Sequence, residues 1–380
     1  MTNQLRHAVG SLLVVGLSGT ELTSLERAWL RLVRPGGIIL FKRNIANATQ
    51  TRGLLHEATG FCVPNAVRCV DVEGGTVNRL RDALAPLPSA QAVGTAVLNT
   101  GKIAFAREHG ELIARAVKAF AFNTTLAPVV DLALPESTEV LGSRPPAAAP
   151  ADVATYARAY LAGLTGQGIA GCGKHFPGLG GASGDTHFVT PSISRTWAQI
   201  WSEDVVPYAD LHADMPMIMM NHAAYPETPG GNVPASASPF WITTVLRKRL
   251  GYRGIILSDD LEMGGILKFL PVDEAAIAAV RAGSDLLEIC HSAELILRSF
   301  EALLREGERS TAFRSLLVVR AREVARKQKR LYASGPARPL SRNQFASLRE
   351  KILRFGETIS SASTRADVID PRAVSPAEIS

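Results

Sequence analysis

Residues 151–176 read ADVATYARAYLAGLTGQGIAGCGKHF, and this stretch contains the repeating unit of the fold. Its first part has the apolar spacing of an amphipathic helix, and Ile169 to His175 then forms a short apolar run. The same order recurs where REHGELIARAVKAF and PFWITTVLRKRLGY each come before another apolar run. Strands that alternate with helical segments are typical of parallel βα units.

Eight such runs can be found along the chain, each rich in small or branched apolar residues. They are Leu12 to Gly16, Gly37 to Phe41, Val67 to Val72, Thr125 to Asp131, Ile169 to His175, Pro216 to His222, Gly254 to Asp259 and Ser284 to Cys290. Eight similar units favour a (β/α)8 barrel of the TIM type over an open doubly wound sheet. No G-x-G-x-x-G follows the first run, so a dinucleotide fold is not indicated.

The βα rhythm stops near residue 330, which sets the predicted domain organisation. We expect one barrel over residues 1–330, although a chain of 380 residues is long enough for two domains. Residues 331–380 are predicted to be an extension with a helix near Phe345 to Phe355. The polar tail that follows has too few apolar residues to fold alone.

Composition and charge exclude several classes of protein. The chain is 46% hydrophobic and 20% charged, as in ordinary globular proteins, and it contains no uninterrupted apolar stretch of membrane-spanning length. Its net charge is +6, with a basic run from Arg314 to Arg330 that we interpret as a solvated helix face, without a nucleic-acid-binding signature. We interpret the N-terminal segment as the first strand and not as an export signal.

The four cysteines lack metal-binding spacing and lie in or beside apolar runs. Cys62, Cys69, Cys172 and Cys290 are therefore predicted to be buried, reduced thiols, which indicates a cytoplasmic location.

Polar side chains stand where the predicted strands end, and in a (β/α)8 barrel the carboxyl ends of the strands form the functional face. These ends hold the FKRN of the second run, Asp71, Asp131, Lys174 with His175, His222, and Asp259 with Asp260. A single such residue could be a helix cap. Six strands ending this way indicate a functional site.

The loop after the fifth run, FPGLGGASGDTHFVTP, is long and rich in glycine, which makes it a candidate lid. Asp185 and His187 stand two residues apart within it. A carboxylate beside an imidazole favours the protonated ring, as a general acid near neutral pH requires. The alternative, a turn-capping aspartate beside a surface histidine, is equally open on these two residues alone.

Together these motifs resemble the barrel of glycoside hydrolase family 3, specifically its NagZ-type β-N-acetylglucosaminidase branch. The resemblance runs from about residue 8 to residue 330 and rests on KHFPG followed by D-x-H, GGIILFKRN, VDVEGGTVNRL, LAPVVDLAL, HAAYP and IILSDDLEM. It implies that Asp259 is the nucleophile of a retaining mechanism and that His187, held by Asp185, is the acid/base. It further implies that the sugar is bound by Asp71, Arg79, Arg144, Lys174 and His175, with His222 and Asn123 as additional candidates.

Two departures from the family pattern concern the residues around this site. The family usually has His at the position of Leu179, and Arg-Ser-Phe where this chain has Arg144, Pro145 and Pro146. Neither change removes a catalytic group, but the second changes how Arg144 is presented to the sugar.

Several residues near these motifs have a structural reading as well. Asp131 could be a buried partner of the backbone or a ligand, and Asp260 should point away from the nucleophile along the strand. Trp29, Trp197, Trp201 and Trp241 could stack on sugar, but their helical context favours the core.

The resemblance implies a retaining exo-β-N-acetylglucosaminidase without metal or cofactor, acting on carbohydrate and trimming muropeptides during cell-wall recycling. One alternative is phosphorolysis on the same barrel. A more distant one is a metallohydrolase in which His175, Asp185, His187 and His222 hold a divalent ion, although Lys174 would then place a cation beside the metal. A non-catalytic sugar-binding barrel would lack the catalytic groups, and they are present.

Overall fold

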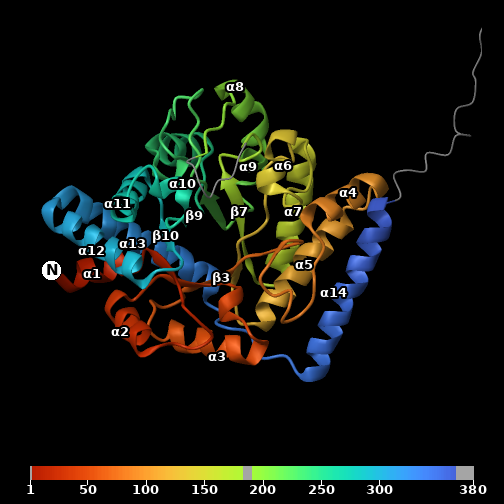
Figure 1. Ribbon diagram of the computed structural model, residues 1–380, viewed down its shortest axis with the longest axis horizontal. Coiled ribbons are helices and arrows are strands. Elements are labelled where there is room, and N and C mark those ends of the chain that lie inside the picture. The colour runs from red at the N-terminus through yellow and green to blue at the C-terminus, as the bar shows by residue number, and fades with distance from the viewer. Residues whose placement is uncertain (1, 183–190, 365–380) are drawn as a thin grey trace, which may run out of the picture.

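The computed structural model describes residues 2–182 and 191–364, and within them eight parallel strands close into a barrel (Figure 1). Around the barrel the strands follow the order β1, β10, β9, β8, β7, β6, β3, β2. Their bounds are β1 Leu13–Gly16, β2 Gly37–Leu40, β3 Val67–Val70, β6 Thr124–Thr125, β7 Ala170–Phe176, β8 Met217–Met220, β9 Ile255–Asp260 and β10 Leu286–Ile289. The predicted (β/α)8 barrel is confirmed.

Each of the eight predicted runs overlaps one barrel strand, but the fourth run shares only Thr125 with β6, Thr124–Thr125, and was predicted to extend too far. β6 ends at Thr125, whereas the run was expected to continue to Asp131. Pro128, which follows a cis peptide bond, has no N–H to donate to a strand ladder. Beyond it the chain stays beside β7, because Val130 N–H donates to the Lys174 carbonyl at 2.8 Å.

Helices pack around the outside of the barrel, between consecutive strands (Figure 1). The longer ones are α2 Ser24–Val33, α3 Ala48–Thr59, α4 Ala90–Thr100, α5 Ala104–Ala119, α7 Pro150–Gly166, the π-helix η5 Phe240–Arg249, α11 Val272–Ala282, α12 Ala293–Arg309 and α13 Thr311–Tyr332. The shorter ones are η1 Lys42–Asn44, η2 Pro135–Ser137, α6 Thr138–Leu141, α8 Trp197–Gln199, η3 Ile200–Asp204, α9 Val206–Leu211, η4 Ala235–Ala237 and α10 Gly264–Leu267. A small hairpin, β4 Val72–Gly74 with β5 Val77–Asn78, follows β3.

Local sequence signals explain where two of these helices begin. Thr23 and Glu26 form a reciprocal capping box at the start of α2. α7 begins at Pro150, a residue favoured at the first helical position because its fixed φ suits a helix and its missing N–H is not needed there.

The two ends of the described chain add helices to the barrel. Helix α1, Thr2–Gly10, precedes β1, where we had expected only a strand. Helix α14, Arg342–Ser363, includes the predicted Phe345 to Phe355 segment and packs along α4 and α5 (Figure 1). The tail after residue 364 lies outside the described residues. None of the described helices is long and apolar enough to cross a membrane.

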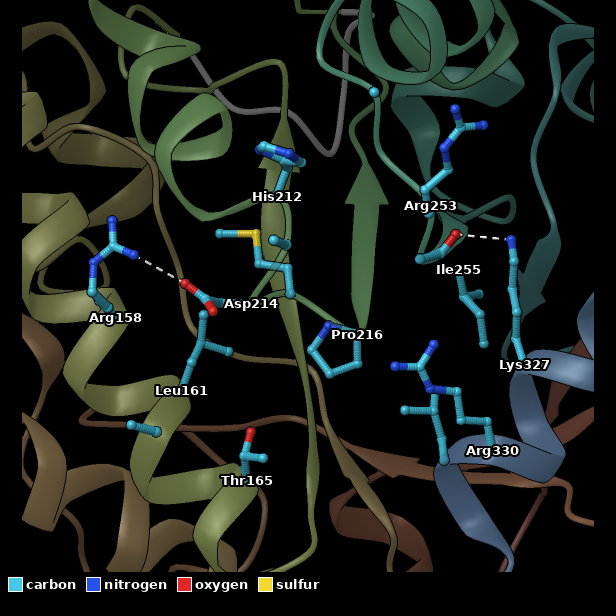
Figure 2. A pocket seen from close by; sticks show the side chains of 16 residues that line it. Arg158, Leu161, Thr165, His212, Asp214, Pro216, Arg253, Ile255, Lys327 and Arg330 are labelled. Carbon is cyan, nitrogen blue, oxygen red and sulfur yellow. Dashed lines mark hydrogen bonds and ion pairs between the residues drawn. The ribbon is translucent and has the colours of Figure 1, made fainter.

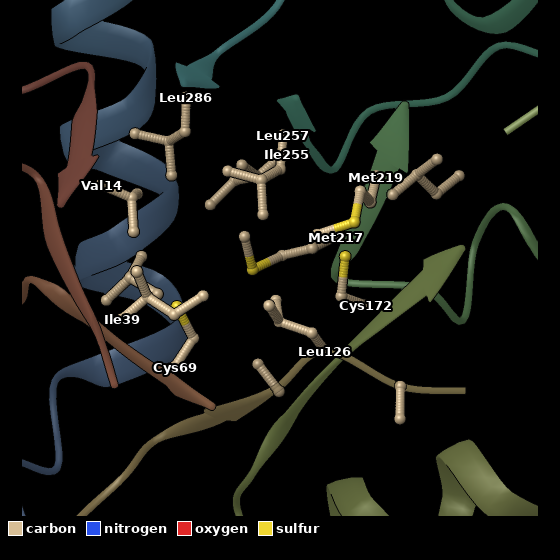
Figure 3. Packing of buried hydrophobic residues seen from close by; sticks show 14 of the residues in the cluster. Val14, Ile39, Cys69, Leu126, Cys172, Met217, Met219, Ile255, Leu257 and Leu286 are labelled. Carbon is tan, nitrogen blue, oxygen red and sulfur yellow. The ribbon is translucent and has the colours of Figure 1, made fainter. Parts of the chain in front are cut away.

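Apolar side chains fill the interior of the barrel (Figure 3). They include Val14, Ile39, Cys69, Leu126, Cys172, Met217, Met219, Ile255, Leu257 and Leu286. All four cysteines are free and buried, as predicted. Burial raises the pKa of the Cys62 thiol to about 12, which keeps it in its unreactive protonated form near neutral pH.

Two expectations about surface and core need correction. Trp201 is 39% exposed and does not belong to the core, whereas Trp29 and Trp241 are buried and the partly buried Trp197 packs against Trp241. The basic run of α13 is also not only a solvated face. Arg320 and Lys327 bind the buried Asp285 at 3.0 and 2.8 Å, because its carboxylate, at the start of β10, needs cationic partners inside the protein.

Candidate active site

Charged residues next to β3, in the hairpin strand β4 and in β7 meet at the carboxyl end of the barrel. Asp71 directly follows β3, and Lys174 lies in β7. The Lys174 ammonium, which is almost fully buried, contacts Asp71 Oδ1 at 2.9 Å and Glu73 Oε1 at 2.6 Å. Burial alone would lower the pKa of Lys174, but these two carboxylates raise it above its usual range, so the ammonium stays charged.

Arg144 reaches the same cluster from the segment before α7. Its guanidinium binds Glu73 through two parallel hydrogen bonds of 2.9 Å, which is the strongest geometry for such a pair. Although burial opposes ionisation of Glu73, Arg144 and Lys174 hold the pKa of its carboxyl well below its usual range. Although Pro145 and Pro146 differ from the family pattern, Arg144 still lies in the site. It binds Glu73, which our sequence analysis did not single out.

His175 is fixed on both of its ring nitrogens. Arg144 Nη2 lies 3.1 Å from His175 Nε2, and a guanidinium can only donate, so Nε2 accepts. The proton of the neutral ring therefore sits on Nδ1, which lies 2.7 Å from Asp131 Oδ2. This leaves His175 with one defined tautomer and orientation.

Asp131 is buried and accepts hydrogen bonds from the backbone. The sequence allowed two roles for it, a backbone partner or a ligand, and the structure shows the first. Its carboxylate accepts hydrogen bonds from the His175 and Leu179 N–H groups as well as from the His175 ring. The hydrogen bond from the Leu179 N–H to Asp131 holds the start of the loop after β7. The Leu179 side chain is buried.

Asp259 and Asp260 form the carboxyl end of β9, and both are partly exposed. Asp259 Oδ1 accepts the Asp260 N–H at 2.9 Å. The Asp260 carboxylate accepts the Glu262 N–H and lies 3.3 Å from His291 Nε2. Asp260 is thus held by its neighbours, whereas Asp259 has one oxygen that makes no such contact within the described chain.

His222 lies buried beside this strand end. Its Nε2 donates to the Asp260 carbonyl at 3.0 Å, and its Nδ1 accepts from the Ser236 hydroxyl at 2.7 Å. Burial lowers the pKa of His222 although Asp259 opposes the shift, so the ring is neutral near pH 7. It supports the backbone at the end of β9.

Glu288 of β10 interacts electrostatically with Asp71 and Lys174 on one side of the site and with Asp259 on the other. It is buried inside the barrel, within reach of the charges of Asp71, Asp259 and Lys174. Burial, together with the two aspartates, raises the pKa of Glu288 well above its usual range. Burial and the nearby carboxylates therefore disfavour a negative charge on Glu288, beneath the charged residues of the barrel mouth.

The rim on the side of β1 and β2 combines aromatic and cationic groups. Arg79 lies 3.9 Å from Asp71 and 6.0 Å from the centre of the Phe41 ring. The ring of Phe41 packs 5.0 Å from His291, and Arg43 donates to His291 Nδ1 at 2.9 Å. Arg43 also binds the Leu17 and Cys290 carbonyls, which joins the rim across β1 and β10.

The structure thus brings together most of the predicted site residues, with two exceptions. Asn123 precedes β6 and bonds the Arg68 N–H and the Ala66 carbonyl at the opposite end of the barrel, so its predicted place at the mouth is wrong. The predicted acid/base pair, Asp185 and His187, lies outside the described residues.

The residues that sequence analysis did not single out are Glu73, Glu288 and His291, and Arg43 appeared there only within the FKRN segment. Glu73 stands in the quoted DVEGG motif, but its importance follows from pairing with residues about 70 and 100 positions away, which no local pattern reveals. Among residues 2–182 and 191–364, no group of three or more His, Cys, Asp or Glu side chains is arranged to hold a metal ion.

Comparisons with known proteins agree with this geometry. Residues 4–321 match the Glycosyl hydrolase family 3 N terminal domain. A β-hexosaminidase from Xanthomonas axonopodis pv. citri is 36% identical over 295 residues, which cover 77% of this chain and 87% of that protein.

Two solved structures of the same family superpose on the chain. A family 3 β-N-acetylglucosaminidase from Paenibacillus sp. str. FPU-7 gives a TM-score of 0.82 at 29% identity, covering 93% of this chain and 68% of that one. NagZ from Neisseria gonorrhoeae, in complex with N-trifluoroacetyl-D-glucosamine, gives 0.75 at 26% identity, covering 93% and 98%. The chain therefore belongs to glycosyl hydrolase family 3 and is a glycoside hydrolase with a (β/α)8 barrel.

Proposed function

We propose that the protein is a retaining exo-β-N-acetylglucosaminidase that removes a terminal β-linked N-acetylglucosamine. One observation carries this proposal. In a chain that matches family 3 along residues 4–321, Asp259 ends β9 at the mouth that also holds the Asp71, Glu73, Arg144 and Lys174 cluster. Relatives named β-hexosaminidase or β-N-acetylglucosaminidase support the choice of sugar.

Asp259 is the proposed nucleophile. Attack on the anomeric carbon requires a carboxylate, and retaining glycosidases use an aspartate or glutamate for this step. The Asp260 N–H fixes one oxygen of Asp259 and leaves the other to form the bond to carbon. The raised pKa of Glu288 disfavours a further negative charge near Asp259, and His222 holds the backbone at this strand end.

The charged cluster is the proposed binding site for the sugar hydroxyls. Asp71, Arg79, Arg144, Lys174 and His175 offer donors and acceptors from rigid strand ends, and hydrogen bonds to ionised groups are stronger than neutral ones. Each of them already has a protein partner in the site. Such mutual pairing keeps the side chains in place before the sugar arrives. His222, which holds the strand beside Asp259, acts in this proposal through the position of the nucleophile.

His187, oriented by Asp185, is the proposed acid/base. In the first step Asp259 bonds to the anomeric carbon while the bond to the aglycone oxygen breaks, and His187 gives that oxygen its proton. In the second step a water molecule gives a proton to His187 and bonds to the anomeric carbon, and the bond to Asp259 breaks. General acid/base catalysis of this kind contributes about 10²–10⁴-fold in rate.

The proposed physiological substrate is a muropeptide in the cytoplasm, where release of N-acetylglucosamine would serve recycling of the cell wall. This part of the proposal rests on the resemblance to the NagZ branch. The proposed site residues lie within residues 71–260, inside the segment that matches the family.

The test is hydrolysis of an aryl β-N-acetylglucosaminide by the wild type, Asp259→Ala and His187→Ala. We expect near-complete loss of activity for Asp259→Ala. For His187→Ala we expect a large loss that is partly relieved with an activated phenol, because such a leaving group needs no proton. Equal activity of wild type and Asp259→Ala would refute the proposal.

The same assay, run with and without inorganic phosphate, separates hydrolysis from phosphorolysis. Hydrolysis predicts free N-acetylglucosamine as the product in both conditions. Formation of N-acetylglucosamine 1-phosphate only when phosphate is present would show instead that phosphate takes the place of water.

A further inference from the structure

A second pocket, of about 780 Å³, lies at the amino-terminal end of the barrel, opposite the charged cluster (Figure 2). Met215 and Pro216 before β8 and Gly254 before β9 contribute to its wall. The other lining residues come from α7, from the segment after α9, from the loop between η5 and β9 with the first residue of β9, and from the last two turns of α13. Its size is in the range of small-molecule binding sites.

Cationic side chains surround this pocket. Figure 2 shows Arg253, Lys327 and Arg330 on one side and Arg158 on the other. Arg158 is neutralised by Asp214, which it binds at 3.0 Å. Lys327 binds Asp285 and the Gly254 carbonyl. Arg253 and Arg330 form no hydrogen bond or ion pair with any part of the chain that the structure describes.

The nearby acidic group cannot balance these charges. Asp285 is shared by Arg247, Arg320 and Lys327, so three cations already converge on one buried carboxylate. Burial lowers the pKa of Lys327, with Arg247 adding to the effect and Asp285 opposing it, as expected for a crowded cationic region. The pocket therefore has an excess of positive charge.

The position of Arg330 in the last turn of α13 has a simple partial explanation, because a helix C-terminus favours a cation. That explanation does not extend to Arg253, which lies in the loop between η5 and β9. The inner wall of the pocket is different in character. Ala162 is exposed there and Pro216 and Leu331 are partly exposed, so these three side chains present an apolar surface.

We propose that this pocket binds a small molecule with two or more negative charges, as phosphate or carboxylate groups, and an apolar body. The guanidinium groups of Arg253 and Arg330 hold the anionic groups, for which their fixed pairs of N–H donors are well suited. The apolar body lies against Ala162, Pro216 and Leu331. The basic run of α13 supplies Lys327 and Arg330 to this site, a use that the glycosidase reaction does not explain.

The test is isothermal titration calorimetry with inorganic pyrophosphate at low ionic strength, where screening is weak. The wild type is expected to bind one pyrophosphate. Arg253→Ala and Arg330→Ala should each weaken binding about tenfold, the loss typical of one charged hydrogen-bonding partner. A parallel titration with citrate distinguishes carboxylate from phosphate ligands.

A matched control removes two arginines from other exposed helix faces. Arg305 and Arg354 are 75% and 63% exposed, and each pairs with a glutamate one turn earlier. The Arg305→Ala/Arg354→Ala double variant should bind pyrophosphate within about twofold of wild type, because both guanidinium groups lie outside the pocket and already pair with a glutamate. All variants should keep wild-type hydrolysis of the aryl substrate, which reports that they fold.

Binding of either anion, weakened by the pocket variants alone, supports the site, and the stronger ligand assigns its chemistry. Two results would overturn it. One is the absence of 1:1 binding of both anions to the wild type. The other is an equal loss of affinity in the control variant, which would mean that general surface charge attracts the anion.

Discussion

Glu73 provides a direct test of how the charged cluster is stabilised. Its side chain is 3% exposed and binds Lys174, also 3% exposed, and Arg144, 21% exposed. In Glu73→Gln the amide keeps one accepting oxygen but turns an NH₂ group toward a cation that donates. Removing one partner of a buried ion pair costs about 3–5 kcal/mol, because a buried charge loses its compensation. Since Lys174 keeps Asp71 at 2.9 Å, we expect a value near the lower end, about 3 kcal/mol.

The pH dependence of this loss follows from the lowered pKa of Glu73. A carboxyl whose pKa is lower in the folded than in the unfolded state stabilises the fold above the unfolded pKa, near ~4.3 for glutamate. This stabilisation disappears as the pH falls toward the folded pKa, by about 1.4 kcal/mol per pH unit. The difference between wild type and Glu73→Gln should therefore be constant from pH 7 to pH 5 and shrink toward pH 3.

The assay is urea unfolding followed by circular dichroism, with Glu57→Gln as the matched control. Glu57 also pairs with an arginine, Arg27, but the two side chains are 43% and 41% exposed. Exposed pairs contribute at most about 1 kcal/mol. If Glu73→Gln lowers the free energy of unfolding by no more than Glu57→Gln does, or if the loss does not depend on pH below 5, our account of the cluster is refuted.

Two further predictions follow from local geometry. Asp131→Asn should lower kcat of aryl substrate hydrolysis at least tenfold, because His175 loses its anionic partner at Nδ1, whereas Asp152→Asn on the outer helix α7 should leave kcat unchanged. Gly74→Ala should destabilise the protein by about 1–3 kcal/mol, since φ is +97° and a Cβ would lie 2.0 Å from the Pro88 carbonyl oxygen. The control Gly53→Ala, inside α3 with open space around it, should stabilise by about 0.5–1 kcal/mol in the same urea unfolding assay, and the opposite order would contradict both assignments.

Much of the fold could be predicted from sequence because barrel strands are buried on both faces. Such strands appear as continuous apolar runs, and eight of them separated by amphipathic segments leave few alternatives to a closed barrel. The fourth strand was overestimated because apolar content does not report hydrogen bonding. Pro128 lies inside that apolar run, but it cannot donate to a ladder.

Site residues could be predicted from the sequence only where a polar residue stands at the end of a predicted strand. Asp71, Lys174 and Asp259 stand at strand ends in the sequence, and the barrel brings such ends together. The partners of these residues depend on pairing across the barrel. Arg43 and His291 are 248 positions apart and meet because β1 and β10 close the barrel. Asn123 precedes the fourth predicted run in the sequence, and its place at the mouth was suggested only alongside the family resemblance, not by its position relative to a strand.

The central claim, that Asp259 forms the covalent intermediate, can be tested most directly by trapping that intermediate. Incubation with a 5-fluoro-N-acetylglucosaminyl fluoride should slow the second step more than the first and leave the sugar bound to the protein. Peptide mass spectrometry should then find one sugar on the peptide that contains Asp259, and none in Asp259→Ala. Labelling of a different carboxylate, or an unlabelled protein that turns over the substrate with inversion of the anomeric configuration, would contradict the account.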